Sequence, residues 1–95
     1  MEKFLEIYND TDDKYVLVSV NRIKFIEKST LTQTVIFFNA NNSNEDVLAI
    51  NHDSTSDFVV KNALIEAVGK IVEEPYTESS IKVNLPVAVS EIKFI

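Results

Sequence analysis

The sequence predicts one mainly β domain, a small and strongly bent five-stranded barrel with a single amphipathic helix. Three observations lead to this prediction: the chain length, short apolar runs that alternate with period two, and two positions where that alternation changes parity. The 95 residues suffice for one hydrophobic core and are too few for two. Since 45% of them are hydrophobic and 25% are charged, the composition is that of a globular domain over residues 1–95.

Short apolar runs separated by turn-forming residues mark the strands. Residues 9–13 and 39–44 are rich in Asn and Asp, which bond to their own backbone and favour turns. The run at residues 35–38 is apolar at consecutive positions, as expected for a strand covered on both faces. The predicted strands are residues 4–8, 15–29, 32–39, 47–51 and 81–95, the last being one strand or two, broken near Pro86.

Two of these segments change the face on which their apolar residues lie. In the strand over residues 15–29 the apolar residues move from even to odd positions near Asn21. In the last segment they move from odd to even positions near Ser90. Because successive side chains point to opposite faces of a sheet, each switch requires a bulge or a bend. Such bends let a small sheet curl far enough to close into a barrel.

The one predicted helix covers about residues 54–73 and precedes the last strand or strands. Ser54 can cap its start, and Asp57 places a carboxylate in its first turn. Gly69 offers an early end, and Pro75 stops the helix in any case. Its apolar positions repeat at intervals of three and four and form one stripe: Val60, Leu64, Val68 and Ile71, with Ala63 and Ala67 beside them.

The composition leaves little room for catalysis or metal binding. Cysteine is absent, which excludes disulfides, thiol catalysis and Cys-ligated metal centres. With a single glycine, Gly69, a Gly-rich phosphate loop is not possible. The sequence His52-Asp53-Ser54 holds the residue types of a hydrolytic triad, but three consecutive residues do not converge as a triad must. The acidic turn at residues 10–13 lacks the Gly and the distal Glu of a calcium loop. We therefore expect no enzyme activity, no metal and no cofactor.

The charge is unevenly distributed along the chain. A net charge of −6 opposes non-specific binding to nucleic acid or to an anionic membrane. Residues 14–39 differ, because they carry four basic residues against the single acidic Glu27. Two interpretations remain open: these residues are ordinary solvated strand positions, or they form a basic binding face.

The candidate nucleic-acid contacts combine these cations with polar residues of the turns. Arg22, Lys24 and Lys28 have even parity on the bent strand, whereas Ile23 and Phe25 have odd parity. The basic side chains should therefore line one face while the apolar ones enter the core. Phe37 or Phe38 could stack on bases, although a core position is favoured for both. The candidates are Arg22, Lys24, Lys28, Asn41, Asn42, Asn51 and His52.

The first ten residues and the hydropathy of the chain bear on its location. The start, MEKFLEIYND, carries charges where a signal peptide needs an apolar run. No segment approaches the roughly 18 uninterrupted apolar residues of a spanning helix. We therefore expect no contact with a membrane and a cytoplasmic protein.

Two short segments carry a family resemblance. Val20-Asn21-Arg22-Ile23 echoes the apolar-Asp-x-x-Met-Asn pattern of the first Sm motif, and Ile50-Asn51-His52 stands where the second carries Ile-Arg-Gly. The whole chain resembles the Sm-like (LSm) proteins, which have a small SH3-like barrel. More narrowly, with eight Lys against one Arg, it is similar to a group of Sm-like proteins from marine metagenomes thought to be of cyanophage origin. It departs from the family by lacking the Arg and Gly of the second motif and by placing its helix after the fourth strand.

The resemblance implies a homo-oligomeric ring of about five to seven subunits, assembled by pairing edge strands of neighbouring subunits. It also implies that the ring binds single-stranded RNA or DNA at its pore or on one face, in the cytoplasm of the host cell. An apolar last strand has to pair with its own sheet or with a neighbour's. The alternative is a protein–protein assembly or scaffold module of phage origin that binds no nucleic acid. The candidate edge residues are Val87, Val89, Ile92 and Phe94.

Overall fold

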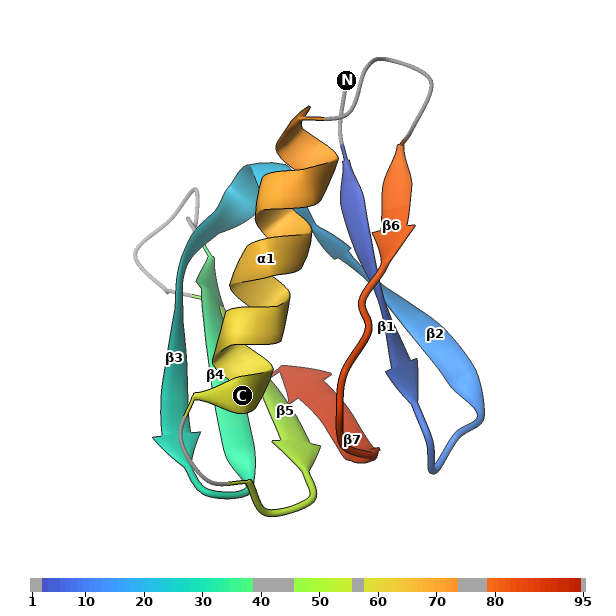
Figure 1. Cartoon of the computed structure of the whole chain (residues 1–95), viewed down its shortest axis with the longest axis vertical. Helices are drawn as coiled ribbons and strands as arrows, with labels where there is room; N and C mark the ends of the chain where they lie inside the picture. Colours follow the sequence, from blue (N-terminus) through green and yellow to red (C-terminus); the bar gives the residue numbers. More distant parts are fainter. Residues whose placement is uncertain (1–2, 39–45, 56–57, 74–78, 95) are drawn as a thin grey trace.

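The computed structural model describes residues 3–38, 46–55, 58–73 and 79–94. Within these ranges the protein is mainly β with one helix, which confirms the predicted class at that level (Figure 1). The elements are the strands β1 (Phe4–Asn9), β2 (Lys14–Ser19), β3 (Ile23–Thr30), β4 (Gln33–Phe38), β5 (Asp46–His52), β6 (Ser80–Lys82) and β7 (Val89–Phe94), a 3-10 turn η1 (Val20–Arg22) and the helix α1 (Val59–Glu73).

The strands form two sheets. One sheet has the order β2-β1-β6, with β6 parallel to β1, and the other has the order β3-β4-β5-β7 and is antiparallel throughout. The described residues therefore form seven strands in two open sheets, not the five strands of a closed barrel. The prediction differs because η1 divides the segment over residues 15–29 into two strands, and residues 83–88 divide the last segment. Moreover, β7 pairs with β5 along its length, and Val89 at its start bonds to Asp10 after β1.

Both predicted parity switches are confirmed, and they take different forms. The first is η1, a 3-10 turn through Asn21 that carries the chain from β2 in one sheet to β3 in the other. The second is a bulge: Asn51 pairs with Glu91 while His52 pairs with Val89, which leaves Ser90 as the extra residue. A 3-10 turn and a bulge each add backbone that breaks the period of two.

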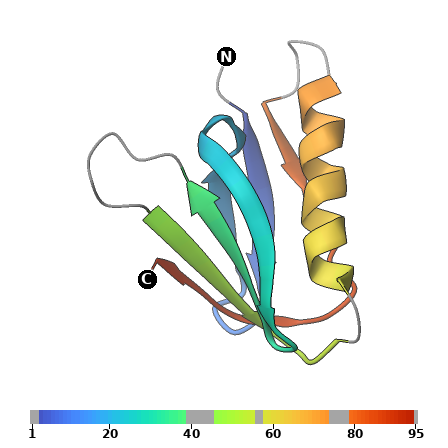
Figure 2. The same ribbon diagram turned by 90° about the vertical axis from the view of Figure 1, so that its left-hand side faces the viewer.

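The helix joins the two sheets over a shared core. It contacts β3 of one sheet and β1 and β6 of the other, and Figures 1 and 2 show it along one side of both. Its predicted apolar stripe is buried at Val60, Leu64 and Ile71, and burying side chains of this size stabilises the fold by about 1.5–3 kcal/mol each. The predicted start at Ser54 is wrong, since this residue is exposed and not helical. The helix passes through Gly69 and reaches Glu73, and Asp57 lies outside the described residues.

Both ends of β1 hold the chain at the two switches. Just before β1, the Lys3 backbone carbonyl accepts the Val20 N–H at 2.8 Å, and the Lys3 N–H donates to Asn21 Oδ1 at 3.0 Å. Just after β1, the Asp10 N–H donates to the Val89 carbonyl at 2.9 Å, and Asp10 Oδ2 accepts the Val89 N–H at 2.8 Å. One strand thus fixes both places where the apolar pattern changes face.

Candidate nucleic-acid interface

The four-stranded sheet has one face toward the core and one away from it. Cross-strand partners share a face, and Ile26, Ile36 and Leu48 are such partners within the core that also holds the helix stripe. The neighbouring positions therefore point the other way. We call this second side the outer face; its residues are Phe25, Glu27, Gln33, Val35, Phe37, Val47, Ala49, Asn51, Glu91 and Lys93.

One half of the outer face is apolar and carries a stacked aromatic pair. The rings of Phe25 and Phe37 lie 4.4 Å apart between centroids, with an angle of 25° between their planes. Phe25 is 40% exposed. Val35 and Ala49 are buried yet are not members of the core cluster. A flat, partly exposed aromatic surface of this kind can stack on nucleic-acid bases.

The other half of the outer face is a row of hydrogen-bonded polar side chains. Gln33 Nε2 donates to Asn51 Oδ1 at 3.0 Å, and Asn51 Nδ2 donates to Glu91 Oε1 at 2.9 Å. Lys93 Nζ lies 3.4 Å from the same Glu91 oxygen. These bonds hold the Asn51 amide in one orientation on the same face as the aromatic pair, where its remaining donor and acceptor capacity can meet a base edge or a phosphate.

The three predicted basic residues do not share one face, which corrects the prediction. Ile23 pairs with Phe38 and Phe25 pairs with Phe37, so Lys24 is an extra residue at a register shift. Beyond this shift, Phe25 turns outward and the following residue, Ile26, enters the core.

The cations consequently lie in three separate places. Arg22 is exposed in η1. The Lys24 ammonium lies 5.8 Å from the Phe25 ring centroid, at the border of the outer face. The Lys28 ammonium instead lies 5.2 Å from the ring centroid of Phe58, at the start of α1.

The predicted polar contacts are divided between the two faces of the sheet. Asn51 lies on the outer face, whereas His52 is 5% exposed and points inward. His52 Nδ1 lies 2.8 Å from the Asp53 carbonyl and therefore donates, so Nε2 accepts from the Thr34 hydroxyl at 3.0 Å. This arrangement takes His52 away from any surface contact with a ligand. Asn41 and Asn42 lie outside the described residues.

The predicted edge residues do not form one exposed strip. Val89 is 1% exposed and belongs to the core, while Val87 and Ile92 are partly buried against it. Phe94 is 67% exposed and borders a groove of about 220 Å³, which also contacts Leu17 of β2. We call this the seam groove, because it lies where the outer strands of the two sheets, β2 and β7, come near each other.

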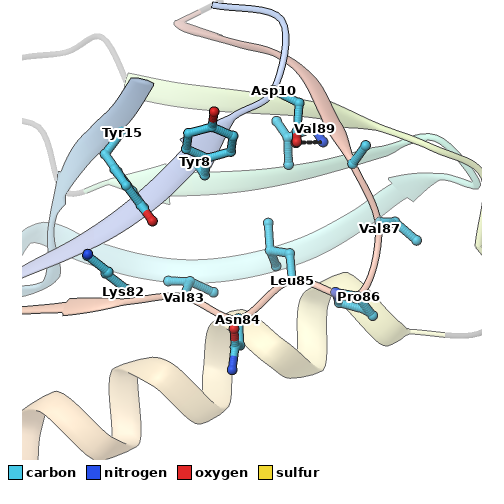
Figure 3. A pocket seen from close by; sticks show the side chains of 11 residues that line it. Tyr8, Asp10, Tyr15, Lys82, Val83, Asn84, Leu85, Pro86, Val87 and Val89 are labelled. Atoms are coloured by element: carbon cyan, nitrogen blue, oxygen red, sulfur yellow. Dashed lines mark hydrogen bonds between the residues drawn. The ribbon is translucent and has the colours of Figure 1, made fainter. Parts of the chain in front are cut away.

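A larger cavity of about 440 Å³ lies against the β1–β2 hairpin (Figure 3). Its walls are Tyr8, Asp10 and Tyr15 on the hairpin side and residues 82–89 on the other. The Tyr8 and Tyr15 rings are cross-strand partners and meet edge to face at 5.1 Å. The Lys82 ammonium lies 5.1 Å from the Tyr15 ring centroid. We call this cavity the hairpin pocket.

Sequence reasoning offered Phe37 as a possible stacking residue but missed its pairing with Phe25, and it missed the hairpin pocket. The odd apolar positions 35 and 37 signalled a second apolar face, but only the shift at Lys24 brings Phe25 to it. The predicted turn over residues 10–13 places Tyr8 opposite Tyr15. Residues 83–88, which close the pocket, have apolar residues at alternate positions as a strand would, but they form no strand.

Among the described residues, no three His, Cys, Asp or Glu side chains are grouped to hold a metal ion. No helix within the described ranges has the length and hydropathy needed to cross a bilayer. No family model, curated protein or solved structure matches this chain. The function therefore has to be argued from the residues themselves.

Proposed function

We propose that the protein is a non-enzymatic, Sm-like protein that forms a homo-oligomeric ring and binds single-stranded RNA or DNA on its outer face. The observation that carries the proposal is the stacked, partly exposed pair Phe25 and Phe37, which shares the outer face with the ordered amide of Asn51. Stacking of one base on an aromatic side chain contributes about 1–3 kcal/mol and tolerates any sequence. The polar row supplies contacts to base edges and phosphates.

The bent path of the chain supports the Sm-like part of the proposal. The turn η1 joins the two sheets at one corner, and the bonds between Asp10 and Val89 join them at another. We infer an opened form of the small barrel, in which the last strand pairs with β5 along the side that a closed barrel would seal. In a ring, the Lys24 ammonium at the border of the outer face repeats around the axis.

Fluorescence anisotropy with labelled oligo-U and oligo-A tests the nucleic-acid part. We expect Phe25→Ala to weaken binding about tenfold, because one stacking partner is lost. Affinity should fall as salt is added, and Lys24→Glu should weaken binding at low salt and make the affinity depend less on salt, since one phosphate contact is lost. Ile65→Ala and Lys70→Glu, both exposed on α1, are the matched controls and should bind as the wild type does. Equal affinity for Phe25→Ala and Ile65→Ala would contradict the proposal.

The seam groove supports the ring. The outer strands of open sheets present unpaired backbone groups to a second chain, and Leu17, 60% exposed, adds an apolar side chain beside β2. We expect sedimentation velocity to give one closed oligomer, which Leu17→Lys dissociates and Val72→Lys, a matched change on α1, does not. A wild-type monomer at high concentration would overturn the ring.

A protein–protein assembly or scaffold function is the second candidate. The observation in its favour is the large exposed apolar surface of a chain with a net charge of −6, which is typical of protein interfaces rather than of nucleic-acid ones. A stable oligomer that binds neither oligonucleotide at low salt would favour this function over the first.

A further inference from the structure

The hairpin pocket has the size and shape of a small-molecule site and lies apart from the outer face. Its volume of about 440 Å³ falls within the range of about 300–1,000 Å³ that is usual for ligand pockets. The β1–β2 hairpin and the segment over residues 82–89 form it, whereas the outer face belongs mainly to β3, β4 and β5. Ligand binding in this pocket is therefore independent of nucleic-acid binding on the outer face.

The inner walls of the pocket are suited to a flat ring. Figure 3 shows the Tyr8 ring on one side and the Leu85 side chain pointing into the pocket from the opposite segment. Tyr8 is held in place at both ends of its ring, by the edge-to-face contact with Tyr15 and by the hydrogen bond from its hydroxyl to Asp13. A rigid aromatic wall facing an aliphatic one buries the two faces of a planar ligand.

The rim of the pocket carries one cation and one carboxylate. The Lys82 ammonium sits over the Tyr15 ring at 5.1 Å, and its exposed position leaves it in reach of an anionic group on a ligand. Asp10 uses Oδ2 to accept the Val89 N–H. A carboxylate has about four acceptor positions, so this bond orients Asp10 without exhausting it. A matching ligand combines a flat ring, N–H donors along one ring edge, and a negative charge.

We propose that the hairpin pocket binds a nucleotide, with its base between Tyr8 and Leu85, its N–H edge on Asp10 and its phosphate on Lys82. Guanine suits Asp10 best, because its ring N–H and its amino group lie side by side and both donate to a carboxylate. Uracil suits it worst, since carbonyl oxygens flank its one N–H and would meet the negative charge. The pocket thus prefers guanine to uracil nucleotides.

Calorimetric titration of the full chain with guanosine 5′-monophosphate, uridine 5′-monophosphate and guanosine tests the proposal. We expect the guanine nucleotide to bind about tenfold more tightly than the uracil nucleotide, in line with the discrimination that a paired polar edge gives. Removing the phosphate, or making Lys82→Gln, should each weaken binding about threefold, as for an exposed ion pair. Lys70→Gln on α1 is the matched control and should bind as the wild type does.

Two further variants keep the result decisive. Asp10→Asn retains an acceptor for the Val89 N–H and should narrow the preference for guanine over uracil. Tyr8→Leu should weaken the binding of both nucleotides about tenfold; if it does not fold, Lys82→Gln, a change at an exposed residue, carries the test alone. Equal affinity for guanine and uracil nucleotides, or equal affinity of Lys82→Gln and Lys70→Gln, would overturn the proposal. Amide shift changes in the hairpin, with none on β4, would separate this site from the outer face.

Discussion

The two places where the apolar pattern changes face differ in what lies beside them. At the first, β2 pairs with β1 whereas β3 pairs with β4, so the chain changes neighbours and makes a complete 3-10 turn. At the second, β7 pairs with β5 on both sides of Ser90, so the ladder continues around a bulge. The same parity signal thus gives a turn where the strand changes partners and a bulge where it keeps one.

The bonds that hold these two places also differ in kind. At the first, an exposed neutral amide, Asn21, accepts the Lys3 N–H. At the second, the charged carboxylate of Asp10 accepts the Val89 N–H in a partly buried setting. Hydrogen bonds to charged groups contribute more than neutral ones, and water replaces a partner more easily at an exposed site. We therefore expect the hydrogen bond between Asp10 and Val89 to contribute more to stability than the one between Asn21 and Lys3.

The largest expected effect comes from the strand that the two places share. Ile7 is fully buried at the centre of β1. Ile7→Ala should lower the free energy of unfolding of the protein by about 2–5 kcal/mol, because a cavity forms in the core. Urea denaturation followed by circular dichroism measures this loss. Amide exchange should accelerate together at Val20 and Val89, and continued protection at either one would show that β1 does not hold both.

The next largest effect tests the hydrogen bond between the Asp10 carboxylate and the Val89 N–H. Asp10→Ala should cost about 1–2 kcal/mol, because the Val89 N–H loses its acceptor in a partly buried setting. Asp10→Asn should cost less, since the amide oxygen can still accept. The exposed Asp53 gives the control, as Asp53→Ala should change the urea midpoint little. A loss as large for Asn as for Ala at position 10 would mean that the charge, not the hydrogen bond, matters.

The smallest effect tests the hydrogen bond between the Asn21 side chain and the Lys3 N–H. Asn21→Ala should cost about 0.5 kcal/mol, because water can satisfy the exposed Lys3 N–H once the side chain is removed. Thermal unfolding at matched protein concentration measures the difference from the wild type. If this variant lost more stability than Asp10→Ala, the Asn21–Lys3 bond would contribute more than the Asp10–Val89 bond, contrary to the expectation.

Alternation along the sequence predicted part of this fold and could not predict the rest. The helix stripe and both parity switches were readable because they depend on the residues of a single segment. The shift at Lys24 was not, because Ile23 and Phe25 alternate regularly and only their partners on β4 reveal the extra residue. The prediction of a closed barrel was wrong for a similar reason. The partner of β7 is β5, a strand about forty positions earlier in the chain, and the residues of β7 alone do not reveal it.

The candidate site divides in the same way. Asn51 was identified from residue type and position and lies on the outer face, which also carries the aromatic pair. His52, the next residue, was identified on the same grounds, yet it is buried against Thr34 of the neighbouring strand. Adjacent strand residues face opposite sides, so one residue of register decides which of the two meets a ligand. Sequence alone does not fix that register.

The parallel pairing of β1 with β6 has a consequence for biosynthesis. Residue 4 lies beside residue 80, so the central strand of the smaller sheet gains its second neighbour only after residues 80–82 have been made. Contacts between such distant segments slow the final folding step. On the ribosome, the hairpin and the β3–β4–β5 meander emerge first and wait, with apolar surface uncovered, until the segment over residues 80–94 leaves the exit tunnel.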